Sequence, residues 1–489
     1  MSEGPRLTQI SSGVSGLDSL LNGGFIDGRL YLVIGPPGTG KTTLGIEFLR
    51  AGLDADESVL FIHGEESEAD LRANANALGI DVTAASFLDI GPESEFFNGS
   101  QSYDVVRPQD VADENLISDV RTAIEDRDPD RVLIDPITQF QYIEPNEYQF
   151  RKRIISFARF LKSRGTTVLA TKTPSGQMDT QLRSLSDGVV NLAYEQEEAG
   201  RRISVPKHRG VGQRDGTHGF EIRDGGAEVY PALLPDQHRR AFEPTRLSSG
   251  IDNLDSLLGG GIERGTVTII SGPSGVGKTT MATEFLHSAA TNGDAALGYL
   301  FEESLETFTY RAETFGIGIT GLREAETLMI EEVTPLSLSS EEFARRIKTQ
   351  VESNSPELVV IDGIAGYRTA IKGTDATVDL RRRLHALTQY LTNMNTSVIL
   401  LDQRSELMGL PQATSTNISY IADNIIFQNY LELEGELQRV VGVLKKRVGG
   451  FETVPRRFRI TPDGLEIGEP LTGTHNALDG LSNRVDKPW

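Results

Sequence analysis

The hydrophobic positions of this chain gather in short apolar runs, and two of these runs lead directly into glycine-rich turns. Leu30–Ile34 and Val267–Ile270 are the two runs, and helix-like stretches follow them at residues 44–51 and 281–289. A continuous apolar run of this length is typical of a strand that is buried on both faces of a parallel sheet. The pattern therefore predicts a strand, a tight turn and a helix in each half of the chain.

Two further apolar runs end in aspartate: Arg131–Asp135 (RVLID) and Leu358–Asp362 (LVVID). Amphipathic stretches precede them, around residues 114–127 and 341–353. Three or four apolar residues before a carboxylate fit a central parallel strand whose carboxyl end faces a ligand crevice. We expect Asp135 and Asp362 to hold Mg²⁺, directly or through water, although an aspartate that only caps the next segment is the alternative.

Both glycine-rich turns match the phosphate-binding motif GxxxxGK[ST], as GPPGTGKT from Gly35 and GPSGVGKT from Gly272. In this motif backbone N–H groups surround the phosphates, the lysine reaches the outer phosphates and the hydroxyl binds Mg²⁺. A chance match in a glycine-rich chain is the alternative for one turn, but two matches after apolar strands predict a tandem P-loop NTPase. The predicted nucleotide-binding residues are Gly35, Pro36, Pro37, Gly38, Thr39, Gly40, Lys41, Thr42, Thr43, Gly272, Pro273, Ser274, Gly275, Val276, Gly277, Lys278, Thr279 and Thr280, with Thr42 and Thr279 also as metal ligands.

The two P-loops belong to a long internal repeat with an offset of 237 residues, from Gly35 to Gly272. The same offset relates Ser11–Gly13 to Ser248–Gly250, so a whole domain is duplicated. We expect a first domain at residues 1–236, a linker at 237–247, a second domain at 248–468 and a polar tail at 469–489. The predicted fold class is α/β, with two tandem domains that each hold a mostly parallel sheet flanked by helices; the RecA-like assignment of these domains is what the family resemblance given below implies.

Paired glutamates follow a third apolar run in each half, Glu65 and Glu66 after VLFIHG and Glu302 and Glu303 after LGYLF. Phosphoryl transfer to water needs a group that orients the water or takes its proton, and a carboxylate at the end of a strand can serve. An acidic first turn of a helix is the alternative, and both interpretations can hold together because helix-like segments begin at this point.

The charge balance of the chain is strongly acidic, with 70 Asp and Glu residues against 48 Lys and Arg and a net charge of −22. Such a surface repels a phosphate backbone, which argues against broad nucleic-acid affinity as a main activity. It suits a protein that works in concentrated salt, so we expect a halophilic source such as a halophilic archaeon. A specific basic partner is the less favoured explanation of the acidic charge. The chain has no cysteine, and no apolar run approaches the length of a membrane span, so we expect a cytoplasmic protein.

These motifs, in this order and in duplicate, resemble the KaiC-type ATPases of the RecA-like superfamily. The resemblance rests on the SSG segment, GPxGxGKTT, the glutamate pair and the strand that ends in Asp, and it covers nearly the whole chain. It implies ATP and Mg²⁺ as cofactors, nucleotide bound between neighbouring subunits of a ring, usually a hexamer, and glutamates that activate the attacking group. It also implies slow turnover and signalling through unidentified partner proteins.

The resemblance further places a Lys-x-Arg segment near the end of each domain, reaching the nucleotide of the next subunit. It carries over to Lys207 and Arg209 in VPKHRG and to Lys445 and Arg447 in VLKKRVG. Cations opposite a transferring phosphoryl group stabilise its developing charge. The alternative is a basic pair on an exposed strand.

Clock-type members of the family carry a Ser–Thr phosphorylation pair in a segment similar to ISYIADNII. This chain keeps Ser419, has Tyr420 in place of the threonine and offers Thr414 upstream, while the first half has Arg183 opposite Ser419. Ser419, Tyr420 and Thr414 are the candidate phosphoacceptors. The alternative is that Ser419 is only a polar residue that packs at a subunit contact.

Three other functions stay open at this point: a recombination or repair ATPase, a helicase-like motor, and a scaffold in which ATP only joins subunits. The acidic charge, the duplicated core and the absence of a basic, aromatic-rich loop argue against the first. The second predicts ATP hydrolysis that nucleic acid stimulates.

Overall fold

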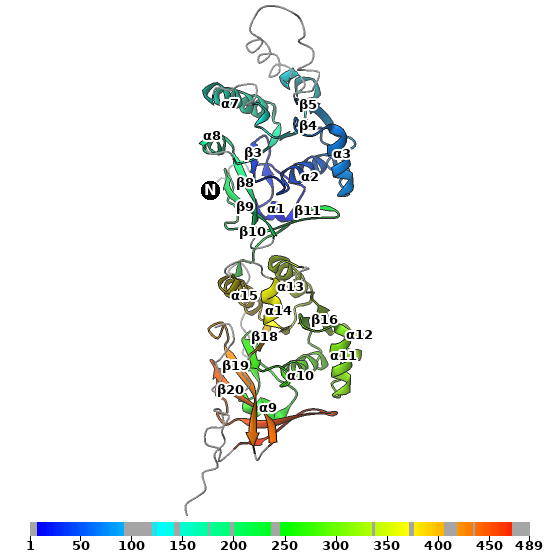
Figure 1. Ribbon diagram of the computed structural model, residues 1–489, viewed down its shortest axis with the longest axis vertical. Coiled ribbons are helices and arrows are strands. Elements are labelled where there is room, and N and C mark those ends of the chain that lie inside the picture. The colour runs from blue at the N-terminus through cyan, green and yellow to red at the C-terminus, as the bar shows by residue number, and fades with distance from the viewer. Residues whose placement is uncertain are drawn as a thin grey trace, which may run out of the picture. The chain divides into compact units, whose positions relative to one another are not determined.

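The computed structural model describes residues 7–91, 120–122, 124–140, 147–174, 177–195, 200–235, 245–334, 338–370, 376–404, 418–433 and 436–471. The chain divides into two compact units, Met1–Ala232 and Leu233–Trp489 (Figure 1). Each unit contains one of the two P-loops, and the units are described separately below.

The first unit alternates strands and helices before it ends in antiparallel strands. Its strands are β1 (Gln9–Ile10), β2 (Phe25–Ile26), β3 (Leu30–Ile34), β4 (Val59–His63), β5 (Ser86–Asp89), β6 (Arg131–Asp135), β7 (Thr167–Lys172), β8 (Gly188–Glu195), β9 (Gly200–His208), β10 (His218–Arg223) and β11 (Gly226–Tyr230). Its helices are α1 (Ser15–Leu20), α2 (Lys41–Leu53), α3 (Glu68–Ala77), α7 (Glu147–Arg164) and α8 (Gln177–Leu185).

The second unit follows the same plan. Its strands are β12 (Arg246–Leu247), β13 (Ile262–Glu263), β14 (Val267–Gly272), β15 (Ala296–Leu300), β16 (Leu328–Glu332), β17 (Leu358–Asp362), β18 (Ser397–Gln403), β19 (Asn424–Leu433), β20 (Glu436–Lys446), β21 (Arg456–Thr461) and β22 (Gly464–Pro470). Its helices are α9 (Asp252–Leu257), α10 (Lys278–Thr291), α11 (Leu305–Thr314), α12 (Thr320–Glu324), α13 (Ser340–Asn354), α14 (Ile364–Ala370) and α15 (Ala376–Asn393).

The main sheet of each unit has nine strands within the described residues, in the order β11-β10-β9-β8-β3-β7-β6-β4-β5 in the first and β22-β21-β20-β19-β14-β18-β17-β15-β16 in the second. The strands from β8 to β5, and from β19 to β16, are parallel, and the remaining three in each sheet are antiparallel. The predicted fold class is confirmed. We call the edge where the parallel strands end the carboxyl edge, and the edge where they begin the amino edge.

The central strands are apolar throughout because both faces of the sheet are covered. In β3, Tyr31 and Val33 pack into one core while Leu32 and Ile34 pack into another. Side chains alternate between the two faces of a strand, so burial on both sides requires an uninterrupted apolar run. This is the physical reason why the strands nearest the P-loops were visible in the sequence.

The helices after the paired glutamates begin later than the sequence pattern suggests. Ser67 and Ser304 are the N-caps of α3 and α11, and their hydroxyls accept hydrogen bonds from Asp70 N and Thr307 N, each at 3.2 Å. A capping serine ends the extended segment and starts the helix at the next residue. The glutamates therefore lie in the loop before each helix and not in its first turn.

The ends of the second unit differ slightly from the predicted ranges. Strand β12 takes up the last two residues of the predicted linker, and β22 runs to Pro470, beyond the predicted domain end at 468. Most of the expected polar tail lies outside the described residues. Within the described part of the chain, no helix combines the length and apolar character needed to cross a membrane.

Candidate functional site

Each P-loop connects the central strand of its sheet to the helix that follows, at the carboxyl edge. In the first unit the turn lies between β3 and α2, and Gly38 and Gly40 have φ of 76° and 97°. In the second, Gly275 and Gly277 have φ of 75° and 119° before α10. These left-handed conformations suit only glycine, and they precede a helix N-terminus whose free N–H groups favour an anion.

The P-loop lysines lie over their own loops. Lys41 Nζ donates to Pro36 O at 3.1 Å, and Lys278 Nζ donates to Pro273 O at 2.8 Å. Burial lowers the pKa of both ammonium groups, while nearby carboxylates oppose this effect: Asp135 acts on Lys41, and Asp362 on Lys278. Each lysine is therefore close to the carboxylate that was predicted to bind metal.

The P-loop threonine and the strand-end aspartate meet directly in both units. Thr42 Oγ1 donates to Asp135 Oδ2 at 2.6 Å, and the Thr279 hydroxyl is hydrogen-bonded to Asp362. A hydroxyl and a carboxylate side by side are suitable ligands for Mg²⁺. No cluster of three or more His, Asp or Glu side chains is arranged for a metal among the described residues, so water and phosphate oxygens would have to complete the coordination.

Asp362 lies in a strongly desolvated position at the end of β17. Burial raises the pKa of this carboxyl to about 6, and Glu303 and Glu302 act in the same direction. The hydrogen bond from Thr279 and the charge of Arg311 oppose the rise. Burial disfavours the charged form of this carboxylate, and a bound metal cation would stabilise it.

The two glutamates of each pair have different surroundings. Glu65 lies near Lys41 and Asp135; burial first, and then Asp135, raise the pKa of its carboxyl. Glu66 turns towards α3, where its Oε2 accepts a hydrogen bond from Asn74 Nδ2 at 3.1 Å. The first glutamate thus faces the P-loop, and the second is held by the following helix.

The second unit repeats this division more strongly. Glu303 accepts two hydrogen bonds from the Arg311 guanidinium, at 2.6 and 2.7 Å. Glu302 packs against Gly363, where an added Cβ would lie 2.8 Å from Glu302 Cγ, and its charge acts on Lys278. Sequence reasoning treated each pair as equivalent and could not see this difference.

The Lys-x-Arg segments lie at the amino edge of each sheet, opposite the P-loop of the same unit. His208 pairs with Gly188, the first residue of β8, and Lys446 pairs with Asn424, the first residue of β19. Strands β8 and β19 are parallel to the P-loop strands β3 and β14. At about 3.3 Å per residue, the length of β3 or β14 separates the two edges by roughly 15 Å.

The lysines of these segments bind backbone carbonyl groups of their own unit. Lys207 Nζ donates to Arg183 O at 2.5 Å and to Ser186 O at 2.6 Å, and Lys445 Nζ donates to Ser419 O at 3.0 Å and to Ala422 O at 2.7 Å. The arginines are more exposed. Arg209 Nη2 donates to Ser184 O at 3.1 Å, and Arg447 forms an ion pair with Asp423 at 2.8 Å.

Ser419 and Tyr420 form a turn before β19, also at the amino edge. Ser419 is half-buried and Tyr420 is 52% exposed. Lys207 donates to Arg183 O in the first unit as Lys445 donates to Ser419 O in the second, so Arg183 is the counterpart of Ser419. Thr414 lies outside the described residues.

Sequence reasoning missed a buried charge beside each P-loop. Lys172, fully buried, ends β7 beside Ile34, and Asp402, 1% exposed, lies next to Ser271 in the corresponding register of β18. Lys172 O accepts from the P-loop Gly35 N at 3.1 Å, and Asp402 is among the charges that raise the pKa of Lys278. The signal was present in TVLATK and SVILLD, where a charge ends an apolar run as it does in RVLID.

Comparison with known proteins agrees with this geometry. The family model described as "ATPase: KaiC" matches twice, at residues 10–233 and 247–472. Similar curated proteins include the circadian clock oscillator protein KaiC of Synechococcus elongatus, 27% identical over 99% of this chain and 93% of the relative. Those of Parathermosynechococcus lividus (27% identical, 99% of this chain and 90% of the relative) and Nostoc sp. (28%, 99% and 93%) are similar to the same degree. Two P-loops, each with its threonine, aspartate and glutamate pair, and a family match over both units show that this chain belongs to the KaiC family of ATPases.

Proposed function

We propose that this protein binds and hydrolyses ATP at both P-loops, within an assembly in which the carboxyl edge of one copy meets the amino edge of the next. The observation that supports this most is the separation of the P-loop from the Lys-x-Arg cations by the length of the sheet. Within one unit the two cannot meet around one nucleotide. A head-to-tail contact brings them together, and such contacts close into rings, of which the family resemblance favours a hexamer.

The residues of each site fit a Mg²⁺-bound nucleotide. The P-loop amides and lysine hold the phosphates, while the threonine and aspartate, in contact in both units, supply oxygen ligands. Bound Mg²⁺ would neutralise phosphate charge during the transfer. Glu65 and Glu302 would orient a water molecule and accept its proton, and Arg209 and Arg447 of the adjacent copy would offset the charge that develops.

A subunit-mixing experiment tests the proposal. The substitutions Glu65→Gln and Glu66→Gln silence the first domain, and two variants are made in this background, Lys278→Ala and Arg447→Ala. Each variant alone should lose second-domain turnover. In a random 1:1 mixture about a quarter of the interfaces pair an intact P-loop with an intact arginine, so about a quarter of the activity should return.

Arg447 is the right cation for this test because it is exposed, whereas Lys445 also holds the turn at Ser419. A mixture as inactive as its two components would show that Arg447 does not act on a neighbouring copy.

Autophosphorylation at Ser419 is a second candidate function, supported by the position of this residue beside Lys445 at the amino edge. Ser419 cannot reach the P-loop of its own unit for the same reason as the cations. The Ser419 hydroxyl would attack the γ-phosphorus held by the adjacent copy, give its proton to that copy's glutamate and release ADP. Tyr420 and Thr414 are the alternative acceptors.

Incubation with Mg·ATP, followed by phosphopeptide mapping across residues 404–428, checks the kinase activity. We expect phosphate on Ser419 that disappears in the Lys278→Ala protein. An unmodified segment in protein that hydrolyses ATP would leave a switch that depends only on nucleotide state. The clock oscillators among the relatives make such signalling the natural extension of our proposal, with partner proteins still to be identified.

A DNA recombination ATPase and an ATP-gated scaffold are the remaining alternatives. The net charge of −22 argues against a recombination ATPase, and stimulation of ATP turnover by single-stranded DNA would support it. Unchanged ATP turnover after Glu302→Gln would support the scaffold.

A further inference from the structure

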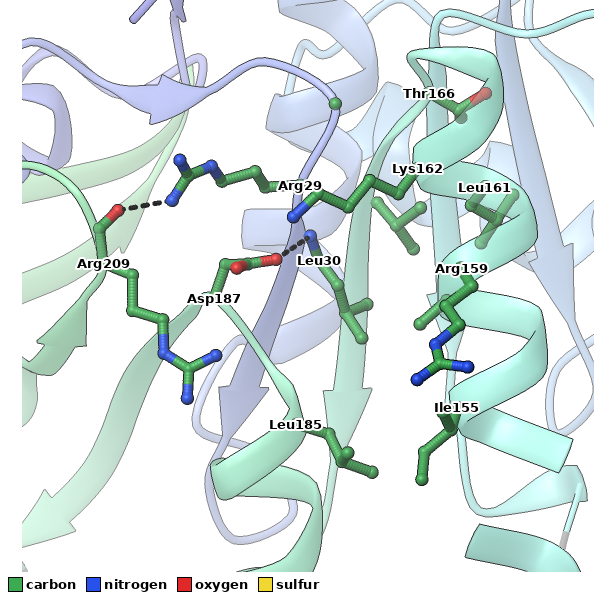
Figure 2. A pocket seen from close by; sticks show the side chains of 13 residues that line it. Arg29, Leu30, Ile155, Arg159, Leu161, Lys162, Thr166, Leu185, Asp187 and Arg209 are labelled. Atoms are coloured by element: carbon green, nitrogen blue, oxygen red, sulfur yellow. Dashed lines mark hydrogen bonds between the residues drawn. The ribbon is translucent and has the colours of Figure 1, made fainter. Parts of the chain in front are cut away.

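The first unit contains a cavity that its nucleotide site does not use. It has a volume of about 250 Å³ and lies at the amino edge, between α7 and the beginnings of β3, β7 and β8. Figure 2 shows Lys162 and Arg159 extending from α7, with Asp187 between them and Arg209, which lies beyond the end of β9; all four residues line the cavity. The P-loop of this unit is at the opposite edge, so this cavity is separate from the site that the unit's own P-loop forms.

The lining of this cavity is basic around an apolar floor. Arg29, Arg159, Lys162 and Arg209 supply four positive charges, and Asp187 supplies one negative charge. Apolar atoms of Ile155, Leu161, Val168 and other residues form the floor. In a chain with a net charge of −22, four cations around one cavity are a marked local reversal of sign.

Two of the four cations, Arg159 and Lys162, make no polar side-chain contact within the part of the chain that the structure describes. Both side chains are exposed. The one carboxylate, Asp187, accepts a hydrogen bond from Leu30 N at 3.4 Å, and Arg29 Nη1 donates to Arg209 O at 2.7 Å (Figure 2). The charge of the lining is therefore not neutralised from within.

The second unit provides an internal comparison, because repeated hydrogen bonds fix the corresponding positions. Gly28 N donates to Thr167 Oγ1 at 2.9 Å, as Gly265 N donates to Ser397 Oγ at 3.1 Å. Thr166 N donates to Leu161 O at 3.3 Å, and Thr396 N to Leu391 O at 3.0 Å. The first pair aligns the beginnings of β3 and β14, and the second aligns the ends of α7 and α15.

With this alignment, three of the four cations are specific to the first unit. Thr266, Gln389 and Thr392 stand where the first unit has Arg29, Arg159 and Lys162. Arg209, by contrast, has Arg447 as its counterpart, since each donates its backbone N–H to the matching aspartate carbonyl at 2.9 Å. The shared arginine belongs to what both domains do, and the other three cations need a separate explanation.

We propose that the first domain binds a small organic polyanion in this cavity, a molecule with a short apolar body and two or more carboxylate or phosphate groups. The cations hold its charged groups, and the floor covers its body. Small-molecule sites combine an apolar floor with a few convergent polar groups in this way. This inference goes beyond ATP hydrolysis and rests on Arg29, Arg159 and Lys162, which the proposed nucleotide contact does not use, whereas Arg209 is shared with that contact.

Calorimetric titration of the full chain with two probes tests the site. Tricarballylate is the carboxylate probe and pyrophosphate the phosphate probe, and Mg·AMP-PNP at saturation fills the P-loops. The test variant Arg29→Thr/Arg159→Gln/Lys162→Thr gives the first unit the residues of the second. The control, Arg121→Gln/Lys152→Thr/Arg164→Thr, removes the same charge from the same unit outside the cavity.

We expect the wild-type and control proteins to bind at least one probe, and the test variant to bind it at least ten-fold more weakly. Binding should also weaken as KCl rises, because salt screens the cations. The stronger of the two probes identifies the anionic group. Unfolding curves and second-domain turnover of the test variant show that it is folded.

Two results would overturn the proposal. In the first, neither probe binds the wild-type protein; if the test variant then also loses self-association, the cations belong to a contact between copies. In the second, the test and control variants bind the probe equally, which would show that the anion binds elsewhere. Subunit mixing can succeed or fail independently of each result, so the two proposals are tested separately.

Discussion

At the scale of single residues, the two carboxylates of each glutamate pair are not equivalent. Glu302 lies against Gly363 and acts on Lys278, whereas Glu303 is fixed by two hydrogen bonds to Arg311. A group that takes a proton must be free to approach the reacting water. The geometry favours Glu302, and Glu65 in the first domain, as the base, with Glu303 and Glu66 in a positioning role.

Glutamine substitutions separate these roles. With the first domain silenced by Glu65→Gln and Glu66→Gln, we expect Glu302→Gln to lower second-domain kcat by about 10²-fold or more, as for loss of a general base. Glu303→Gln should lower it less than about ten-fold, because the amide still accepts a hydrogen bond from Arg311. ATP turnover is the measurement, with nucleotide affinity as the control. Equal losses would contradict the assignment.

The buried Asp362 makes the second domain sensitive to pH. In the site without metal, its pKa of about 6 means that the carboxyl takes up a proton as pH falls through 6, so Mg²⁺ has to displace this proton in order to bind. With the first domain silenced, the Mg²⁺ concentration that gives half-maximal second-domain turnover should rise as pH is lowered from 8 to 5. A Mg²⁺ requirement that stays constant over this range would show that protonation of Asp362 does not compete with the metal.

The same group should lower folding stability at neutral pH. Its folded pKa of about 6 lies above the ordinary value of 3.8, so the folded state binds the extra proton between these values. Its contribution to stability therefore falls as pH rises from about 4 to 6, and above 6 the buried charge is a full cost. We expect Asp362→Asn to raise the free energy of unfolding at pH 8 by roughly 1 to 3 kcal/mol while it abolishes turnover. Destabilisation in a denaturant titration would contradict this.

At the scale of elements, the last hairpin of each unit covers the helix that begins at the P-loop. Phe220 and Ile222 of β10 lie next to Gly40, and Phe458 and Ile460 of β21 lie next to Gly277. A glutamate of the helix, buried in the first unit and half-buried in the second, binds each hairpin: Glu47 accepts from Ala227 N at 3.1 Å, and Glu284 accepts from Leu465 N at 3.0 Å. The strands farthest along the chain thus support the nucleotide site.

Removal of the Glu284 carboxylate tests this support. Glu284→Ala leaves Leu465 N without its partner, which should lower the free energy of unfolding by about 1 to 3 kcal/mol. Glu284→Gln, which keeps an acceptor, should lose less, and Glu306→Ala on the exposed face of α11 should change stability by less than about 0.5 kcal/mol. Urea unfolding measures all three. If Glu284→Ala were as stable as Glu306→Ala, the apolar side chains alone would hold the hairpin.

Sequence reasoning predicted the P-loops, the strand-end aspartates and the fold class, because each depends on a local pattern. It treated the paired glutamates as equivalent and missed Lys172 and Asp402, because these depend on neighbours from other strands. It also left the Lys-x-Arg cations without a location. Only the antiparallel return of β9 and β20 puts them at the amino edge.

At the scale of the whole molecule, the net charge of −22 is the dominant feature outside the two sites. Self-repulsion of this charge destabilises the compact state, and salt screens it over a Debye length of about 3 Å at 1 M. We expect the midpoint of thermal unfolding to rise by at least about 5 °C between 0.1 and 2 M KCl. A midpoint that stays constant or falls would contradict the prediction of a protein adapted to concentrated salt.

The sequence by itself determined the duplication, the two P-loops and the α/β class, because burial on both faces of a parallel sheet requires continuous apolar runs and a phosphate loop requires glycine at fixed spacing. The tertiary structure decided which glutamate faces the P-loop, which edge carries the cations and where the first domain departs from the second. Those properties arise from strand order and register, which bring together residues more than a hundred positions apart, such as Leu30 and Val168. No local pattern records such distances, and for this reason the basic cavity became visible only in the folded chain.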